Sequence, residues 1–206
     1  MNEVEEISHS QMAVAAAKVA AELHAAGKMA QELSLVAKNT RTMVVRAGDS
    51  ARGLKVIAEH FSELADKTIA LTRTINNLAI NISRASVVGW QSKNLSKSLA
   101  KANMLAQNAT FVDTLKKPIK SSLDANTSLE VDFRKLVEEM NVRLEDIRTF
   151  MRSTDVISVT FRLEAIQTGE YEGILTDMAG KINILSEDIK THVSSSRELF
   201  SSRRAA

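Results

Sequence analysis

Residues 54 to 82 read LKVIAEHFSELADKTIALTRTINNLAINI. Apolar or small side chains recur in this stretch at alternating intervals of three and four residues: Leu54, Ile57, Phe61, Leu64, Thr68, Leu71, Ile75, Leu78 and Ile82. This spacing places them on one side of a helix, and its persistence over several heptads is typical of a coiled-coil seam. The stretch therefore predicts a long helix that packs against other helices along its length.

The residues before this stretch show the same alternation, at Met12, Ala16, Val19, Leu23, Ala26, Ala30, Leu33, Ala37, Thr40 and Val44. Many of them are alanines, which permit close approach of neighbouring helices. The sequence RAGDSARG at 46–53 separates the two patterns by only a few residues. Gly, Asp and Ser favour a turn, and a connection this short joins antiparallel neighbours. A first helical hairpin is predicted.

The C-terminal part repeats this organisation. A seam runs through Leu175, Met178, Ile182, Leu185, Ile189, His192, Ser196 and Leu199, and the turn-like sequence QTGEYEG at 167–173 precedes it. The two hairpins superpose without a gap when Gly48, Ala58 and Leu64 are set on Gly169, Ala179 and Leu185, each pair 121 positions apart. Since 121 is not a multiple of seven, a shared heptad alone does not produce this agreement. The chain carries an internal repeat.

The connection between the hairpins is expected near Asn108 to Asn126. Beyond Ile82 the seam weakens, and Pro118 is not compatible with the interior of a straight helix. We therefore divide the chain into a first hairpin at 1–107, a connection at 108–126 and a second hairpin at 127–206. The expected fold is all-α, an elongated antiparallel four-helix coiled-coil bundle made of two helical hairpins.

Composition agrees with few, long helices and excludes several classes of protein. The 206 residues include 7 Gly, 1 Pro and no Cys, and aromatic residues make up 4%. The net charge is +2, and no basic stripe interleaved with aromatic residues occurs, so nucleic acid is not an expected partner. No uncharged apolar run reaches about 18 residues, so we expect a soluble, cytoplasmic protein without direct membrane insertion. No cofactor or metal is expected.

The segment LSLVAKNTRTMVVRAGDSARGLKVIAEHFSEL, Leu33 to Leu64, resembles the membrane-distal tip of methyl-accepting chemotaxis proteins. RAGDSARG is the most specific part of this resemblance. The residues that agree with the family pattern are Asn39, Arg46, Ala47, Gly48, Arg52, Gly53, Val56, Ala58 and Leu64, and Asp49, Leu54 and Ile57 are close substitutes.

The second copy, Thr154 to Leu185, is fainter. It agrees with the family pattern at Thr154, Glu164, Ala165, Gly169, Glu170, Ala179 and Leu185. The first copy has Met43 in place of the family's tip glutamate, which Glu164 keeps in the second copy. In turn, the family's Asn and Arg positions hold Thr160 and Gln167 in the second copy.

The resemblance implies a function in chemotaxis signal transduction. In the family, hairpins from two subunits pair into a four-helix bundle whose tip contacts other receptors, a histidine kinase and a coupling protein. This chain is expected to supply both hairpins itself, as a monomeric pseudo-dimer or weak oligomer, and to lie at chemosensory arrays. The resemblance assigns the tip contacts to Asn39, Arg46, Gly48, Asp49, Arg52, Gly53, Glu164, Gly169 and Glu170.

Two other functions remain open. One is a helical-bundle phosphatase of a response regulator, in which Gln167 orients water and Glu170 or Asp177 holds magnesium. The other is a structural or localisation adaptor. For this function Trp90, which lies beyond the strict seam, is a candidate partner anchor, although it equally fits a space between Ala and Gly residues. We expect no enzymatic activity, because charge complementarity with a helix N-terminus explains the acidic residues near Gln167 more simply.

Overall fold

The computed structural model describes the backbone of residues 3–201 and the side chains of residues 14–199. Four α-helices account for most of this part: α1 (Glu3–Ala47), α2 (Leu54–Leu105), α3 (Lys116–Ala165) and α4 (Glu172–Ser201). Short 3-10 segments, η1 (Gly48–Ala51), η2 (Val112–Leu115) and η3 (Ile166–Tyr171), lie between them. No strand occurs within residues 3–201, so the predicted all-α class is confirmed.

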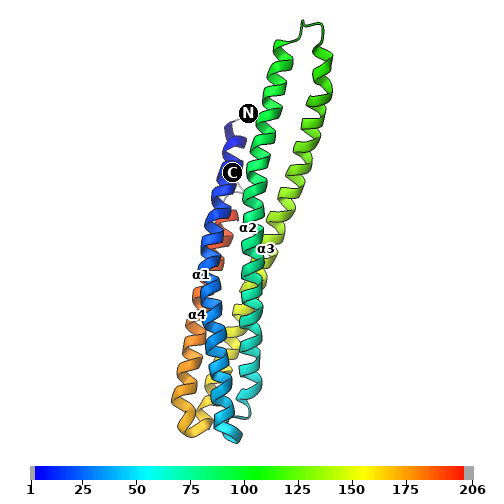
Figure 1. Ribbon diagram of the computed structural model, residues 1–206. Helices are drawn as coiled ribbons and strands as arrows, with labels where there is room; N and C mark the ends of the chain where they lie inside the picture. Colours follow the sequence, from blue (N-terminus) through cyan, green and yellow to red (C-terminus); the bar gives the residue numbers. More distant parts are fainter. Residues whose placement is uncertain (1–2, 202–206) are drawn as a thin grey trace.

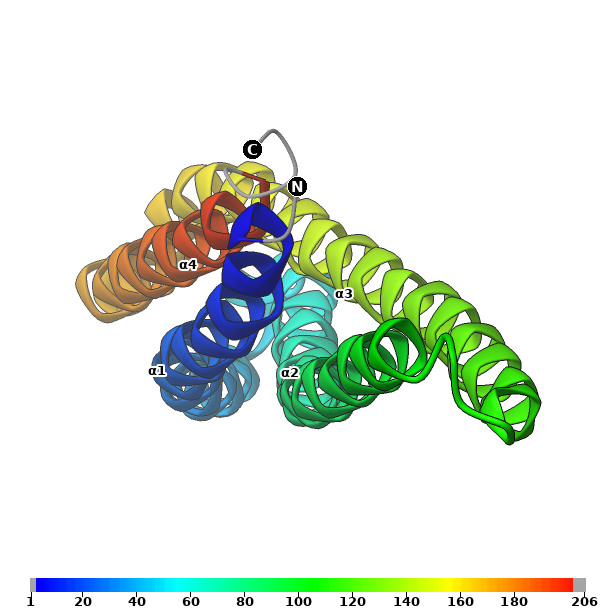
Figure 2. The same cartoon turned by 90° about the horizontal axis from the view of Figure 1, so that it is seen from above.

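The helices lie side by side in an elongated bundle (Figures 1 and 2). Helix α1 packs against α2 and α4, and α3 packs against the same two helices. Each helix therefore has two main neighbours, and a single hydrophobic core runs between them. None of the described helices is long and apolar enough to cross a membrane.

The core is lined largely by small side chains. Every predicted seam residue of α1 from Ala16 to Val44 is buried, whereas Met12 lies outside the described side chains. In α2 the predicted positions Leu54, Phe61, Thr68, Ile75 and Ile82 are also buried. Alanine in these positions lets the helices approach closely, which explains how so few aromatic residues fill the core.

Three positions of the predicted α2 seam are wrong by one residue. Ile57, Leu64 and Leu71 are only half-buried, and the buried positions are Ala58, Ala65 and Thr72. The same shift occurs in α4, where Ala179, Ser186 and Val193 replace the predicted Met178, Leu185 and His192. The reason is spatial: small residues occupy the crowded centre of the bundle, while the larger neighbours cover the edges between adjacent helices.

The internal repeat is present in the burial pattern. The buried seam of α1 from Val19 to Val44 reappears 121 positions later in α3, at Met140, Leu144, Ile147, Met151, Thr154, Ser158, Phe161 and Ala165. The seam of α2 from Leu54 to Ile75 reappears in α4, at Leu175, Ala179, Ile182, Ser186, Ile189, Val193 and Ser196. Phe61 of the first copy meets Phe161 of the second with ring centroids 5.8 Å apart.

The buried threonine hydroxyl groups of α1, α2 and α3 are satisfied within their own helices. Thr40 donates to the Val36 carbonyl at 2.8 Å, Thr68 to that of Leu64 at 2.7 Å, and Thr154 to that of Phe150 at 3.0 Å. Because a buried polar group is costly only when it lacks a partner, these threonines can occupy core positions.

Helices α2 and α3 extend together beyond the ends of the other two helices (Figure 1). We call residues 93–126 the arm. The predicted connection at 108–126 is too long, because α3 already begins at Lys116. Pro118 is compatible with this helix because it lies in the first turn, where its missing N–H has no intrahelical partner to lose.

Candidate functional site

The two predicted turns lie at the same end of the molecule, opposite the arm (Figure 1). Segment η1 of the first copy contacts η3 of the second. Helices α1 and α2 position the first turn, and α3 and α4 position the second. We call residues 46–53 and 164–173 together the turn end.

Both turns use a glycine with a positive φ. Gly48 has φ 61° and Gly169 has φ 63°, and no other described residue has a positive φ. This left-handed region is unfavourable for residues with a Cβ, so glycine suits the reversal of the chain. The two glycines are the pair that the repeat aligns, so the copies share a positive-φ glycine at the chain reversal as well as a burial pattern.

The charged side chains of the first turn point into solvent. Arg46, Asp49 and Arg52 are all exposed. Arg52 and Asp49 form an ion pair at 2.7 Å, in which both side chains remain more than four-fifths exposed. Such an exposed pair contributes little to stability, so these residues are available for a partner. Asn39 is also exposed but lies two turns up α1, away from the chain reversal.

The structure brings Gly53 of the first copy next to Glu164 of the second. A Cβ at Gly53 would lie only 2.9 Å from Oε2 of Glu164, so a larger residue there would displace the carboxylate. Gly53 is the N-cap of α2, where a negative charge is favourable because helix N–H groups point outward. Glu164 therefore joins the two copies at the turn end, a relation that the sequence alone did not predict.

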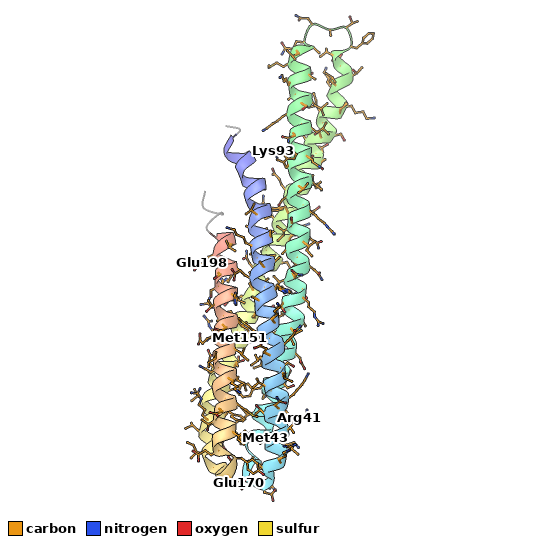
Figure 3. The ribbon with its side chains drawn as sticks, turned by 60° about the vertical axis from the view of Figure 1, so that its left-hand side comes forward. Arg41, Met43, Lys93, Met151, Glu170 and Glu198 are labelled. Carbon is orange, nitrogen blue, oxygen red and sulfur yellow. The ribbon has the colours of Figure 1, made fainter. Side chains whose placement is uncertain are left out.

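The equivalent positions on the other side of the bundle differ in character. Met43 corresponds to Glu164, and Ile174 corresponds to Gly53. Met43 is partly buried against the core, and Figure 3 shows it near Arg41 at the lower part of the bundle. The carboxylate and glycine of one side thus have apolar counterparts on the other, and the turn end is asymmetric.

A row of exposed apolar side chains approaches the turn end along α3. Val156, Val159, Leu163 and Ile166 have exposed fractions of 69%, 59%, 61% and 58%. Their spacing of three, four and three places them on one side of the helix. We call them the apolar stripe. The stripe was not predicted from the sequence, because the buried seam residues Thr154, Ser158, Phe161 and Ala165 are interleaved with it. A second apolar pattern with 3-4-3 spacing on the same helix could have indicated it.

The other residues singled out from the sequence lie at the surface. Gln167, Gly169, Glu170 and Asp177 are exposed, and Glu170 lies at the bottom of the molecule in Figure 3. Among the residues that the structure describes, no group of three His, Asp or Glu side chains could share a metal ion. Trp90 is 47% exposed on α2, outside the turn end.

A scan against protein-family models, a search of curated proteins and a search of solved structures each find no match to this chain. Function is therefore inferred from the residues of the turn end and from their geometry.

Proposed function

We propose that this chain is a chemoreceptor-like interaction module of bacterial chemotaxis, in which two hairpins of one chain take the place of two receptor subunits. In this proposal the bundle is an antiparallel four-helix coiled coil, and the turn end binds receptors, the histidine kinase or the coupling protein. The observation that carries it is the pairing of two turns, each built on a glycine near φ 60°, at one end of the molecule.

The turn end has the chemistry of a protein interface. It combines exposed arginines in the first turn with the apolar stripe on α3, and exposed apolar side chains beside charged groups are typical of protein-binding surfaces. Among the residues of RAGDSARG that resemble the family, Ala47 is half-buried, and the others are exposed: Arg46, Asp49, Arg52 and the two glycines. Their side chains are not needed for packing, which supports a role in recognition.

The proposed location at chemosensory arrays follows from these partners. Fluorescent fusions in cells that form arrays should gather at them. Arg46→Glu with Arg52→Glu should disperse the fusion, because both exposed charges are reversed where a partner would contact them.

Pull-downs with purified kinase, coupling protein and receptor signalling domains would test binding directly. We expect Val159→Ser with Leu163→Ser to weaken capture at least tenfold, because both side chains would lose apolar contact with the partner. Val87→Ser with Val88→Ser is the matched control, because these residues are comparably exposed but lie far from the turn end.

Arg73→Glu with Arg84→Glu controls for charge in the arginine experiment, since both arginines are exposed along α2. Circular dichroism should show unchanged helicity in all four variants. Equal binding by the turn-end variants and their controls would contradict the proposal.

A further inference from the structure

The arm ends in exposed apolar side chains at the opposite end of the molecule. Met104, Leu105 and Phe111 are 65%, 77% and 77% exposed, and they lie around the connection between α2 and α3. Single exposed apolar residues are common, but three large ones at the end of a projecting hairpin need a physical reason. Their position at the end of the hairpin suits contact with a broad surface.

The same end of the arm is strongly basic. Residues 93–126 contain six lysines and two aspartates, whereas the rest of the chain has 21 basic and 23 acidic side chains. Lys101, Lys116, Lys117 and Lys120 are exposed around the apolar residues. Lys116 forms an exposed ion pair with Asp113 at 2.7 Å, which offsets one of these charges. The arm therefore has a net charge of +4 and the rest of the chain has −2.

On the inner face of the arm, polar side chains of α2 and α3 form hydrogen bonds with each other. Ser96 of α2 and Ser122 of α3 are hydrogen-bonded to each other, and Asn126 donates to Ser96 at 2.7 Å. These bonds join the two helices without help from a further helix. A second copy of the arm is also a poor partner, because two surfaces of net positive charge repel each other.

We propose that the end of the arm binds an anionic lipid bilayer. The lysines supply attraction to negatively charged headgroups, and Met104, Leu105 and Phe111 enter the boundary between headgroups and acyl chains. This contact is peripheral, and no described helix crosses the bilayer. The sequence predicts no direct membrane insertion, and the proposal adds a peripheral contact between the end of the arm and the bilayer surface.

Nucleic acid fits the arm less well. Its cations are all lysines, and Phe111 is its one aromatic side chain. Recognition of nucleic acid commonly uses arginine forks and several stacked aromatic residues, whereas lysines around flexible apolar side chains suit a lipid surface.

Co-sedimentation with vesicles would test the charge requirement. The full chain should bind vesicles of phosphatidylcholine with added phosphatidylserine and should not bind pure phosphatidylcholine. Lys101→Gln, Lys117→Gln and Lys120→Gln together should lower the partition coefficient on the order of 100-fold, since each lysine contributes about fivefold near an anionic surface. Lys18→Gln, Lys28→Gln and Lys38→Gln, which change the same charge on exposed positions of α1, should retain binding within a few-fold.

The apolar requirement has its own variant. Leu105→Ser with Phe111→Ser keeps every lysine but should lower partitioning about tenfold or more, because two apolar side chains no longer enter the bilayer. Val87→Ser with Val88→Ser should leave it unchanged. Binding to pure phosphatidylcholine vesicles, or equal losses of binding in the arm variants and their controls, would overturn the proposal. Failure of the full chain to bind phosphatidylserine-containing vesicles at low salt would also overturn it.

Tryptophan fluorescence would show which end meets the lipid. Trp90 is the only tryptophan and lies about 20 Å along α2 from the end of the arm, so it should keep its emission when vesicles are added. A Trp90→Phe, Phe111→Trp variant should shift to the blue with phosphatidylserine vesicles. A shift of Trp90 without one at position 111, or a shift at position 111 with duplex DNA in place of vesicles, would contradict the lipid assignment.

Discussion

At the residue scale, two glycines determine how the chain reverses at the turn end. Gly48 and Gly169 both lie in the left-handed region, and neither has another atom near the place where a Cβ would be. Their requirement for glycine is therefore a matter of backbone conformation and not of space. Gly173, in contrast, has ordinary helical geometry and equally open surroundings.

We predict that Gly48→Ala and Gly169→Ala each lower the free energy of unfolding by about 1 kcal/mol, because alanine pays a steric cost at positive φ. Gly173→Ala should be neutral or slightly stabilising. Urea denaturation followed by circular dichroism would measure all three. Equal effects at the three sites would mean that the turns do not hold this conformation in solution.

Burial distinguishes two leucines that the sequence pattern treated alike. Leu175 is fully buried and Leu185 is only half-buried. Leu175→Ala should therefore cost about 2–5 kcal/mol in unfolding free energy, because it leaves a cavity. Leu185→Ala should cost roughly half as much or less, since solvent can occupy part of the vacated space. If denaturant unfolding showed a larger loss of unfolding free energy for Leu185→Ala than for Leu175→Ala, Leu185 would be a seam residue, as the sequence pattern predicts.

At the element scale, the helices and turns could be predicted from the sequence, but several seam positions of α2 and α4 could not. Ile57 and Ala58 are adjacent apolar residues, so a 3-4 pattern can be drawn through either one. The choice depends on how closely the helices approach, and here the alanine occupies the centre. The contact between Gly53 and Glu164 could not be predicted from a local sequence pattern either, because it depends on how one hairpin lies against the other.

The α3–α4 pair differs from the α1–α2 pair in its polar contacts. In the first copy Ser34 donates to Asp66 at 3.0 Å. In the second copy Asp155 stands at the position of Ser34 and Lys190 at that of Ile69. Lys190 donates to Asp155 and to Glu187, each at 2.6 Å. Equivalent positions of the two copies are therefore joined by different polar contacts.

We predict that Lys190→Ile destabilises the protein by about 1–2 kcal/mol, because Asp155 loses a charged partner in a partly buried place. Adding Asp155→Ser should recover much of this loss, since the pair then has the residues of the first copy. A double-mutant cycle in urea would measure the coupling. A purely additive double variant would show that the contact contributes little.

The same contact has a pH dependence. Partial burial by itself would lower the pKa of Lys190, but the hydrogen bonds that Lys190 donates to Asp155 and Glu187, together with the charges of these carboxylates, raise it above its usual value of 10.5. A raised pKa in the folded state means that this stabilisation is complete below about pH 10.5 and is lost as pH rises through the folded pKa. The stability difference between wild type and Lys190→Ile should therefore be constant from neutral pH to about pH 9 and shrink at higher pH.

At the scale of the whole molecule, contacts between the hairpins make one body from two repeats. His192 of α4 lies 2.6 Å from a carboxylate oxygen of Glu22 in α1, and Phe61 packs on Phe161. The interface that would join two subunits is thus formed within one chain.

We predict a monomer in sedimentation velocity at micromolar concentration, with a high frictional ratio because the 52-residue α2 alone spans about 78 Å. Intramolecular pairing already buries the seam of each hairpin, so a second chain is not required. A tight obligate dimer, with the hairpins exchanged between chains, would contradict this arrangement.

The asymmetry of the repeats fixes the valency of the molecule. The first-copy positions equivalent to the apolar stripe hold Leu35, Lys38, Thr42 and Val45, so two of the four are polar. A partner that recognises the stripe finds it once per chain, whereas a symmetric dimer would offer it twice. Such a molecule can be added to an ordered assembly in only one orientation, and it ends a chain of contacts that a two-sided neighbour would continue.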